Sequence, residues 1–107
     1  MNLNNAAKTL LLKDYLVVDA SRILVGSISS LMLAEMGANV IKVEMPGQGD
    51  DTRHWGPPFI ESSDKKRKDS TYYMSLNRNK KSIAINFKHE LGIKAVHDLI
   101  KQSDIFL

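Results

Sequence analysis

The pattern of hydrophobic residues in the first half of the chain predicts a strand, a helix and a second strand. Residues 15–19 are a short β-branched run typical of a buried strand, and residues 39–44 form a similar run. Between them a helix is predicted over residues 27–36, with Ser27 as its N-cap and Gly37 as the left-handed residue behind it. The residues at helical spacing in this stretch are Ile28, Leu31, Met32 and Glu35. Strand, helix and strand within about thirty residues predict a βαβ unit with parallel strands and a right-handed crossover.

The middle of the chain contains breakers and a polar stretch. Residues 46–58 include three Pro and three Gly, which predict a loop. Residues 61–70 are polar and charged without apolar periodicity, so we expect an exposed loop there. Residues 72–76 are predicted to be a short extended piece, and the alternation over residues 82–87 predicts a strand.

Residues 90–103 give the clearest helix of the sequence. Glu90 near its start and Lys101 near its end suit the helix macrodipole. Its apolar stripe consists of Leu91, Ile93, Ala95, Val96, Leu99 and Ile100. Residues 104–107 begin another strand, in which the sequence stops, so we expect a truncated chain. We divide it into an N-terminal lead-in, residues 1–13, and an α/β, Rossmann-like βαβ portion, residues 14–107, that belongs to a larger domain.

Composition is that of an ordinary soluble domain, with 43% hydrophobic and 25% charged residues. No apolar run is long enough to cross a bilayer, so we expect no membrane partner. The absence of Cys excludes disulfides and thiol chemistry within these 107 residues. His54, His89 and His97 share no metal-ligand spacing, so no metal site is predicted.

The formal net charge of +3 is concentrated in two blocks, residues 65–68 and residues 78–81. Charge alone would suit a nucleic acid, a membrane or a polyanionic cofactor. Asp64 and Asp69 flank the first block, and no recognised nucleic-acid motif or aromatic platform accompanies it. We therefore interpret that block as a solvated insertion and expect no nucleic-acid partner.

Four segments in the same order together resemble the opening of the family III CoA-transferases (the CaiB/BaiF family). They are residues 21–26 (SRILVG), 37–44 (GANVIKVE), 47–59 (GQGDDTRHWGPPF) and 72–83 (YYMSLNRNKKSI). The amino-acid sequence of the third segment most resembles the succinyl-CoA:glutarate branch of that family. The resemblance covers nearly all of residues 14–107.

The resemblance implies a Rossmann-like large domain, an interlaced homodimer when the protein is full length, and transfer of CoA from an acyl-CoA to a free carboxylic acid. It also implies an Asp nucleophile that attacks the thioester. The motif that holds this Asp is expected beyond Leu107, so no catalytic residue is assigned and the chain alone is expected to be inactive. No permanently bound cofactor is implied, because the CoA thioester is a substrate.

The resemblance assigns the CoA site to two parts of the chain. Ile23, Leu24 and Val25 match positions whose backbone lines the site, after the first strand. Ile85 and Lys88 match positions that hold the adenine and its phosphate end. Without the resemblance, Ile85 would be interpreted as strand core and Lys88 as a solvated lysine at a helix start.

Three other residues bear on the site. Ser27 stands where the family usually has Pro, and Met45 stands where it often has an Arg that lies against the adenine. Met can still pack on an aromatic ring, but it carries no charge. Arg53 could bind a substrate carboxylate, although a structural ion pair is the favoured interpretation.

Several alternatives remain open at this point. An α-methylacyl-CoA racemase shares the same scaffold, and a non-catalytic CoA-binding fragment would show the same residues. A basic nucleic-acid-binding module is the alternative from another class. We expect an intracellular soluble protein, mitochondrial if it is eukaryotic and otherwise cytoplasmic.

Overall fold

The computed structural model describes residues 10–107 and contains a four-stranded parallel sheet. The strand order is β5-β2-β1-β6, with β1 at Leu16–Asp19, β2 at Asn39–Glu44, β5 at Lys81–Ala84 and β6 at Ile105–Phe106. Both predicted strands of the βαβ unit are present, and they pair in parallel. Most of the predicted lead-in, residues 1–9, lies outside the described residues.

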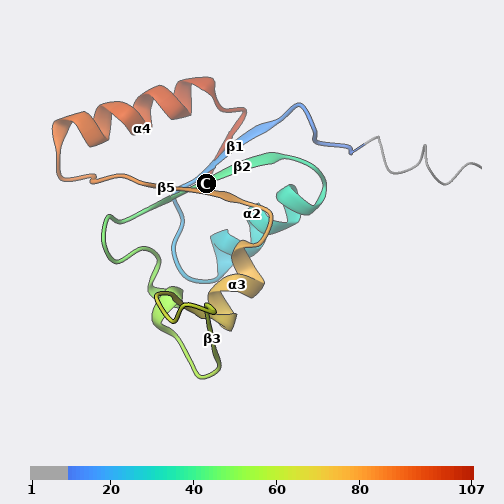
Figure 1. The fold of residues 1–107 in the computed structure, drawn as a ribbon. Helices are drawn as coiled ribbons and strands as arrows, with labels where there is room; N and C mark the ends of the chain where they lie inside the picture. The colour runs from blue at the N-terminus through green and yellow to red at the C-terminus, as the bar shows by residue number, and fades with distance from the viewer. Residues whose placement is uncertain (1–9) are drawn as a thin grey trace, which may run out of the picture.

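Helices cover the two faces of this sheet (Figure 1). Helix α2 (Val25–Glu35) and helix α3 (Thr71–Asn77) lie on one side, and helix α4 (Glu90–Gln102) lies on the other. The helix predicted over residues 90–103 is therefore confirmed, as is the α/β class. No helix within the described part of the chain is long and apolar enough to span a bilayer.

The core forms two clusters because side chains alternate between the faces of a strand. The cluster on the α2 face consists of Val17, Ala34, Ala38 and Val40. The cluster on the α4 face consists of Val18, Val43, Ile85 and Val96. The same alternation puts the buried charged residues Asp19, Lys42 and Glu44 on the α2 face, at the carboxyl ends of β1 and β2.

The start of α2 differs from the predicted one. The helix begins at Val25, after Leu24, whose side chain cannot cap it, so Ser27 lies inside the first turn. Ser27 is fully buried and its hydroxyl accepts a hydrogen bond from the Lys42 ammonium at 3.1 Å. The predicted N-cap is therefore wrong, because a buried cation satisfies the serine in place of the helix backbone.

The residues that α2 buries are not the set that the helical spacing singled out. The buried residues are Ser27, Ser30, Leu31 and Ala34. Ile28 and Met32, which the spacing singled out, are 39% and 60% exposed. Small and hydroxyl side chains face the sheet because the charged residues of β1 and β2 lie beneath this helix.

The end of α2 confirms the role predicted for Gly37, which has φ +104°. Its N–H donates to Ala34 O at 3.0 Å, and the Ala38 N–H donates to Leu33 O at 3.0 Å. These two bonds form a Schellman motif, which satisfies the last carbonyls of the helix.

The segment after residue 70 is helical, so the extended piece predicted over residues 72–76 is wrong. Its Tyr and Thr residues favour strands, but Ser70 caps α3 by accepting the Tyr73 N–H at 3.4 Å. Strand β5 also ends earlier than predicted, at Ala84, and Ile85 instead donates its N–H to Glu44 O at 3.0 Å.

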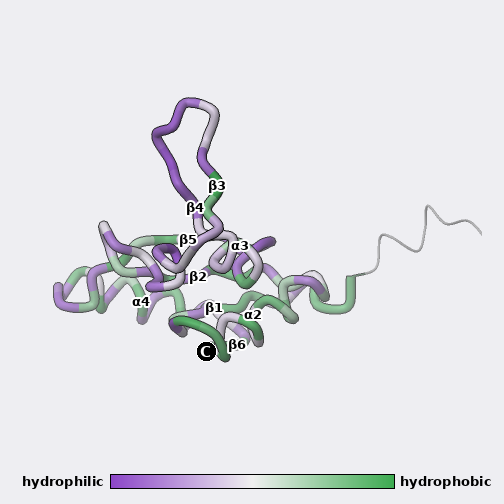
Figure 2. Tube along the Cα trace, turned by 90° about the horizontal axis from the view of Figure 1, so that it is seen from below, coloured by the Kyte–Doolittle hydropathy of each residue, from purple (hydrophilic) through white to green (hydrophobic). Residues whose placement is uncertain are grey.

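The polar segment between residues 61 and 70 forms a β-hairpin. Strand β3 (Phe59–Glu61) pairs antiparallel with β4 (Lys68–Ser70), and the loop before them contains a 3₁₀ helix, η1 (Asp51–His54). Figure 2 shows the hairpin projecting from the rest of the molecule with a hydrophilic tip. Residues 63–68 are all exposed.

We predict that Ser70→Ala lowers the free energy of unfolding by about 1–2 kcal/mol. Ser70 is fully buried, its hydroxyl accepts from Tyr73 and donates to the Trp55 carbonyl, and Ala would leave both partners unsatisfied. Urea unfolding followed by circular dichroism measures the change. Ser75→Ala is the matched control, because Ser75 is exposed on the same helix and should change stability by less than about 0.5 kcal/mol.

Candidate functional site

A cavity of about 410 Å³ lies at the carboxyl ends of the parallel strands. Three segments line it: residues 20–22 after β1, residues 43–46 and 49–50 at and after the end of β2, and residues 85–88 after β5. Ligands of open α/β sheets bind in this position, outside the carboxyl ends of the strands. We call the first two segments the β1 wall and the β2 wall.

The lining of the cavity is largely apolar, with charged groups among it. Val43, Ile85 and Phe87 supply apolar surface, together with Met45, which is 49% exposed. Lys88 is exposed, and among residues 10–107 it has no ion-pair partner within 4 Å. Such a surface suits a flat apolar group with an anionic group beside it.

The structure brings two of the residues proposed for the CoA site to this cavity. Ile85 is buried against the α4-face core and also lines the cavity, and Lys88 follows it. Ile23, Leu24 and Val25 are not among the lining residues in the described part of the chain. They continue from the β1 wall into α2, are exposed, and include a left-handed residue, Ile23, at φ +64°.

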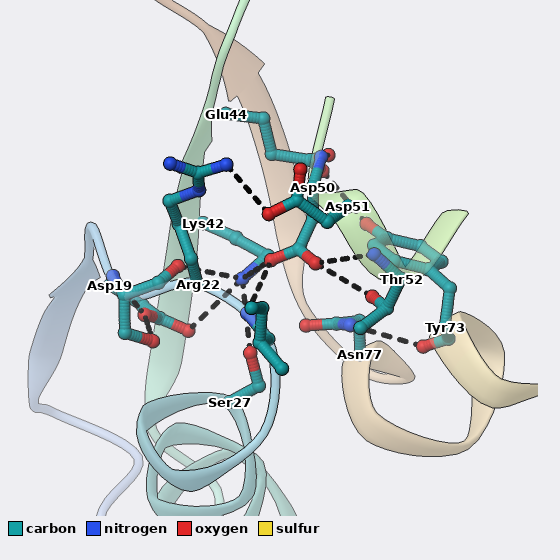
Figure 3. Close-up of polar contacts among 12 residues, drawn as sticks. Asp19, Arg22, Ser27, Lys42, Glu44, Asp50, Asp51, Thr52, Tyr73 and Asn77 are labelled. Carbon is teal, nitrogen blue, oxygen red and sulfur yellow. Dashed lines mark hydrogen bonds and ion pairs between the residues drawn. The ribbon is translucent and has the colours of Figure 1, made fainter. Parts of the chain in front are cut away.

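Beside the cavity lies a buried polar network with Lys42 at its centre (Figure 3). The Lys42 side chain is 1% exposed, and its ammonium lies 3.1 Å from the Ser21 carbonyl, 3.1 Å from the Ser27 hydroxyl and 3.1 Å from the Asp50 carboxylate. The Asp19 carboxylate is 3.9 Å away. One cation from β2 therefore contacts the β1 wall, helix α2 and the β2 wall.

Asp50 links the same parts from the opposite side. One of its carboxylate oxygens accepts from the Ile23 N–H at 3.2 Å, and the other accepts from the Thr52 N–H and hydroxyl at 3.0 and 2.7 Å. Burial opposes ionisation of Asp50, but the bonds from Thr52 and the charge of Lys42 outweigh it and lower its pKa. Asp50 is therefore ionised when it pairs with Lys42.

A second buried cation, Lys80, balances the charge of the network. Its ammonium is 3.4 Å from the Asp19 carboxylate, 2.8 Å from the Ser27 carbonyl and 3.0 Å from the Asn77 amide oxygen. Asp19 also accepts from the hydroxyls of Ser21 and Ser30. Two lysines and two aspartates thus give the network no net charge.

Glu44 forms an adjacent cluster with Arg53 and Tyr73. The guanidinium of Arg53 binds both Glu44 carboxylate oxygens at 2.7 Å and lies 3.8 Å from the Tyr73 ring centroid. Arg53 therefore forms a structural ion pair, which is the interpretation favoured from the sequence. Burial alone would raise the pKa of Glu44, but its hydrogen bonds lower it from 4.5 to about 2, chiefly through the side chains of Arg53, Ser82 and Tyr73. Burial and the Glu44 carboxylate raise the pKa of Tyr73, which therefore donates as a neutral phenol.

Sequence reasoning missed Lys42, Asp50 and Lys80. One signal was present, because Lys42 sits between Ile41 and Val43 in a strand that is otherwise apolar there. A lysine in a buried strand requires a partner, and partners cannot be identified from spacing alone. Among residues 10–107 no group of three or more His, Asp or Glu residues could hold a metal ion.

We predict that Glu44 makes the stability of the fold depend on acid pH. Its pKa is about 2 in the folded chain and near 4.5 when unfolded, so its contribution is fully present above about pH 4.5 and is lost as pH falls through 2. The loss amounts to about 3 kcal/mol. The difference in unfolding free energy between wild type and Glu44→Gln should therefore shrink between pH 5 and pH 2, as measured by urea unfolding. Glu61→Gln, at an exposed position without an ion pair among residues 10–107, is the control for removal of a surface carboxylate.

Most of the chain is similar to proteins of one known family. Residues 12–107 match the family model described as CoA-transferase family III. The succinyl-CoA:glutarate CoA-transferase of Homo sapiens is 48% identical over 91 residues, which are 85% of this chain and 19% of that protein. The succinate–glutarate CoA-transferase of Agrobacterium fabrum is 45% identical over 91 residues, 85% of this chain and 23% of that protein.

A solved structure shares the fold. The crystal structure of a CAIB/BAIF family protein from Brucella suis superimposes with a TM-score of 0.86 at 39% identity, covering 92% of this chain and 25% of that one. The chain thus spans about a fifth to a quarter of the length of these relatives. With a family model matched over nearly its whole length and a fold that agrees, the chain belongs to CoA-transferase family III.

Proposed function

We propose that this chain supplies part of the CoA site of an enzyme that moves CoA from an acyl-CoA, such as succinyl-CoA, to a free dicarboxylic acid, such as glutarate. The observation that carries the proposal is the cavity at the carboxyl ends of β1, β2 and β5 in a chain of this family. The names of the human and Agrobacterium relatives support the choice of acids.

The cavity has the chemistry that the nucleotide end of CoA requires. Its apolar residues, Ile85, Phe87 and Met45, can pack on the adenine ring, and Lys88 can pair with a phosphate. Arg22 also lines the cavity, but it already pairs with Asp51 at 2.6 Å. Lys88 is therefore the better candidate for the phosphate.

The turn at Ile23, Leu24 and Val25 brings backbone N–H groups beside the cavity, of which that of Ile23 already donates to Asp50. Val25 is the first residue of α2, and the first N–H groups of a helix have no partner within it. Such groups favour anions, which supports a role for this turn in binding a phosphate or the thioester end of CoA. The proposal thus keeps all five residues: Ile23, Leu24, Val25, Ile85 and Lys88.

The chemical step is assigned to no residue of this chain. Asp19 and Asp50 are fully engaged with lysines and hydroxyls, so neither carboxylate is available as a nucleophile. The Asp that attacks the thioester and the interlaced homodimer, both implied by the family, belong to the proposal for the whole protein. We expect the 107-residue chain to bind CoA without turnover.

We predict that Lys88→Ala weakens binding of CoA about fivefold, through loss of one exposed charge-assisted contact. Isothermal titration calorimetry measures the affinity. Dephospho-CoA, titrated in parallel, shows whether the lost contact is to the 3′-phosphate. Lys66→Ala, which removes an equal charge from the hairpin tip, is the control and should bind CoA as wild type does. Equal affinities for wild type and Lys88→Ala would contradict this assignment.

We predict that the whole protein converts succinyl-CoA and glutarate into glutaryl-CoA and succinate, because CoA transfer conserves the thioester. Liquid chromatography of the CoA esters follows the exchange. Failure with a panel of dicarboxylic acids, together with racemisation of a 2-methylacyl-CoA, would replace this proposal by the racemase alternative.

A further inference from the structure

We propose that the buried pair Lys42–Asp50 positions the β1 and β2 walls of the cavity and thereby sets its affinity for CoA. This inference rests on the proposed function, because it takes CoA as the ligand of the cavity. Both side chains are 1% exposed, so their effect on a ligand is exerted through the residues that they hold.

Lys42 joins the two walls directly. Its ammonium contacts the carbonyl of Ser21, in the β1 wall, and the carboxylate of Asp50, in the β2 wall, each at 3.1 Å. The two walls share no strand pairing beyond Asp19 and Lys42, where the β1–β2 ladder ends. Beyond that point the two walls are connected through the Lys42 side chain.

Asp50 completes the link through the backbone. It accepts the Ile23 N–H at 3.2 Å, and its own N–H donates to the Glu44 carboxylate at 2.8 Å. A single residue thereby fixes the turn after β1 to the end of β2. Without it, the turn at residues 21–24 would lose its hydrogen bond to the β2 wall.

The turn at residues 21–24 contains a backbone conformation that is unfavourable by itself. Ile23 has φ +64°, and a β-branched residue in the left-handed region costs about 1–2 kcal/mol. Such a conformation persists when the surrounding contacts determine it. The contacts on its two sides are the Lys42 bond to Ser21 O and the Asp50 bond to Ile23 N–H.

Charge balance decides which variant tests the idea. Lys42→Met alone would leave Asp19 and Asp50 with one lysine, and a buried unpaired charge is strongly destabilising. The double variant Lys42→Met/Asp50→Asn removes one charge of each sign and leaves the Lys80–Asp19 pair, 3.4 Å apart, intact. We expect this variant to fold without the buried link between the walls, while the exposed Arg22–Asp51 pair remains.

The test measures CoA affinity by calorimetry and the Ile23 amide by ¹⁵N–¹H NMR in the 107-residue chain. We expect the double variant to melt cooperatively, to bind CoA about tenfold more weakly and to show a shifted, less protected Ile23 amide, because an unlinked site must be ordered on binding. Val17→Ala is the control for destabilisation alone. Val17 lies in the α2-face core outside the cavity lining, so this variant should bind CoA as wild type does.

Three outcomes are informative. A folded double variant with wild-type CoA affinity, or with an unchanged Ile23 amide, would overturn the positioning role while leaving the proposed function in place. The whole wild-type protein is titrated in parallel, and absence of CoA binding by it would overturn the proposed function, and this inference with it. Should the double variant fail to melt cooperatively, Lys42→Gln/Asp50→Asn, which also removes one charge of each sign and keeps polar groups beside the Ser21 carbonyl and the Ser27 hydroxyl, is judged by the same two readouts.

Discussion

The burial of four charged side chains in one network is the constraint on which the rest of this structure depends. Transfer of an ion from water to a protein interior costs several kcal/mol, so Lys42, Lys80, Asp19 and Asp50 can stay buried only together. Satisfying them requires hydroxyl side chains on the inner face of α2 and an amide from α3. The network therefore determines how these helices lie on the sheet, and it shares that face with a hydrophobic cluster that contains the small residues Ala34 and Ala38.

The sequence predicted those elements whose pattern is local. The apolar runs of β1 and β2, the helix α4 and the glycine after α2 all depend on residues within one element, and all four are present. The stripe predicted for α4 is buried only at Val96, whereas Leu91, Ile93 and Ala95 are exposed. The misassigned elements depend on distant partners. Ser27 is satisfied by Lys42, fifteen residues later, and α3 is capped by a serine whose hydroxyl also binds the Trp55 carbonyl.

The residues of the candidate site also fall into those that the sequence predicts and those that depend on distant partners. Ile85 and Lys88 were predicted from a family resemblance, and both lie in the lining of one cavity. The polar residues beside that cavity were not identified, because their contacts join residues up to 61 positions apart. Spacing along a sequence carries no information on such pairs. The position of Lys42 between two apolar residues of a strand is a local signal, and it indicates a buried lysine that needs a partner without identifying that partner.

The central position of β1 has a consequence for the order in which the chain folds. Val17 pairs with Val40, 23 residues away, and with Ile105, 88 residues away. Closing the longer loop costs about 1 kcal/mol more in chain entropy, so the β1–β2 pair should form first. During synthesis one edge of β1 must therefore stay unpaired until β6 leaves the ribosome, which exposes it to pairing with other chains.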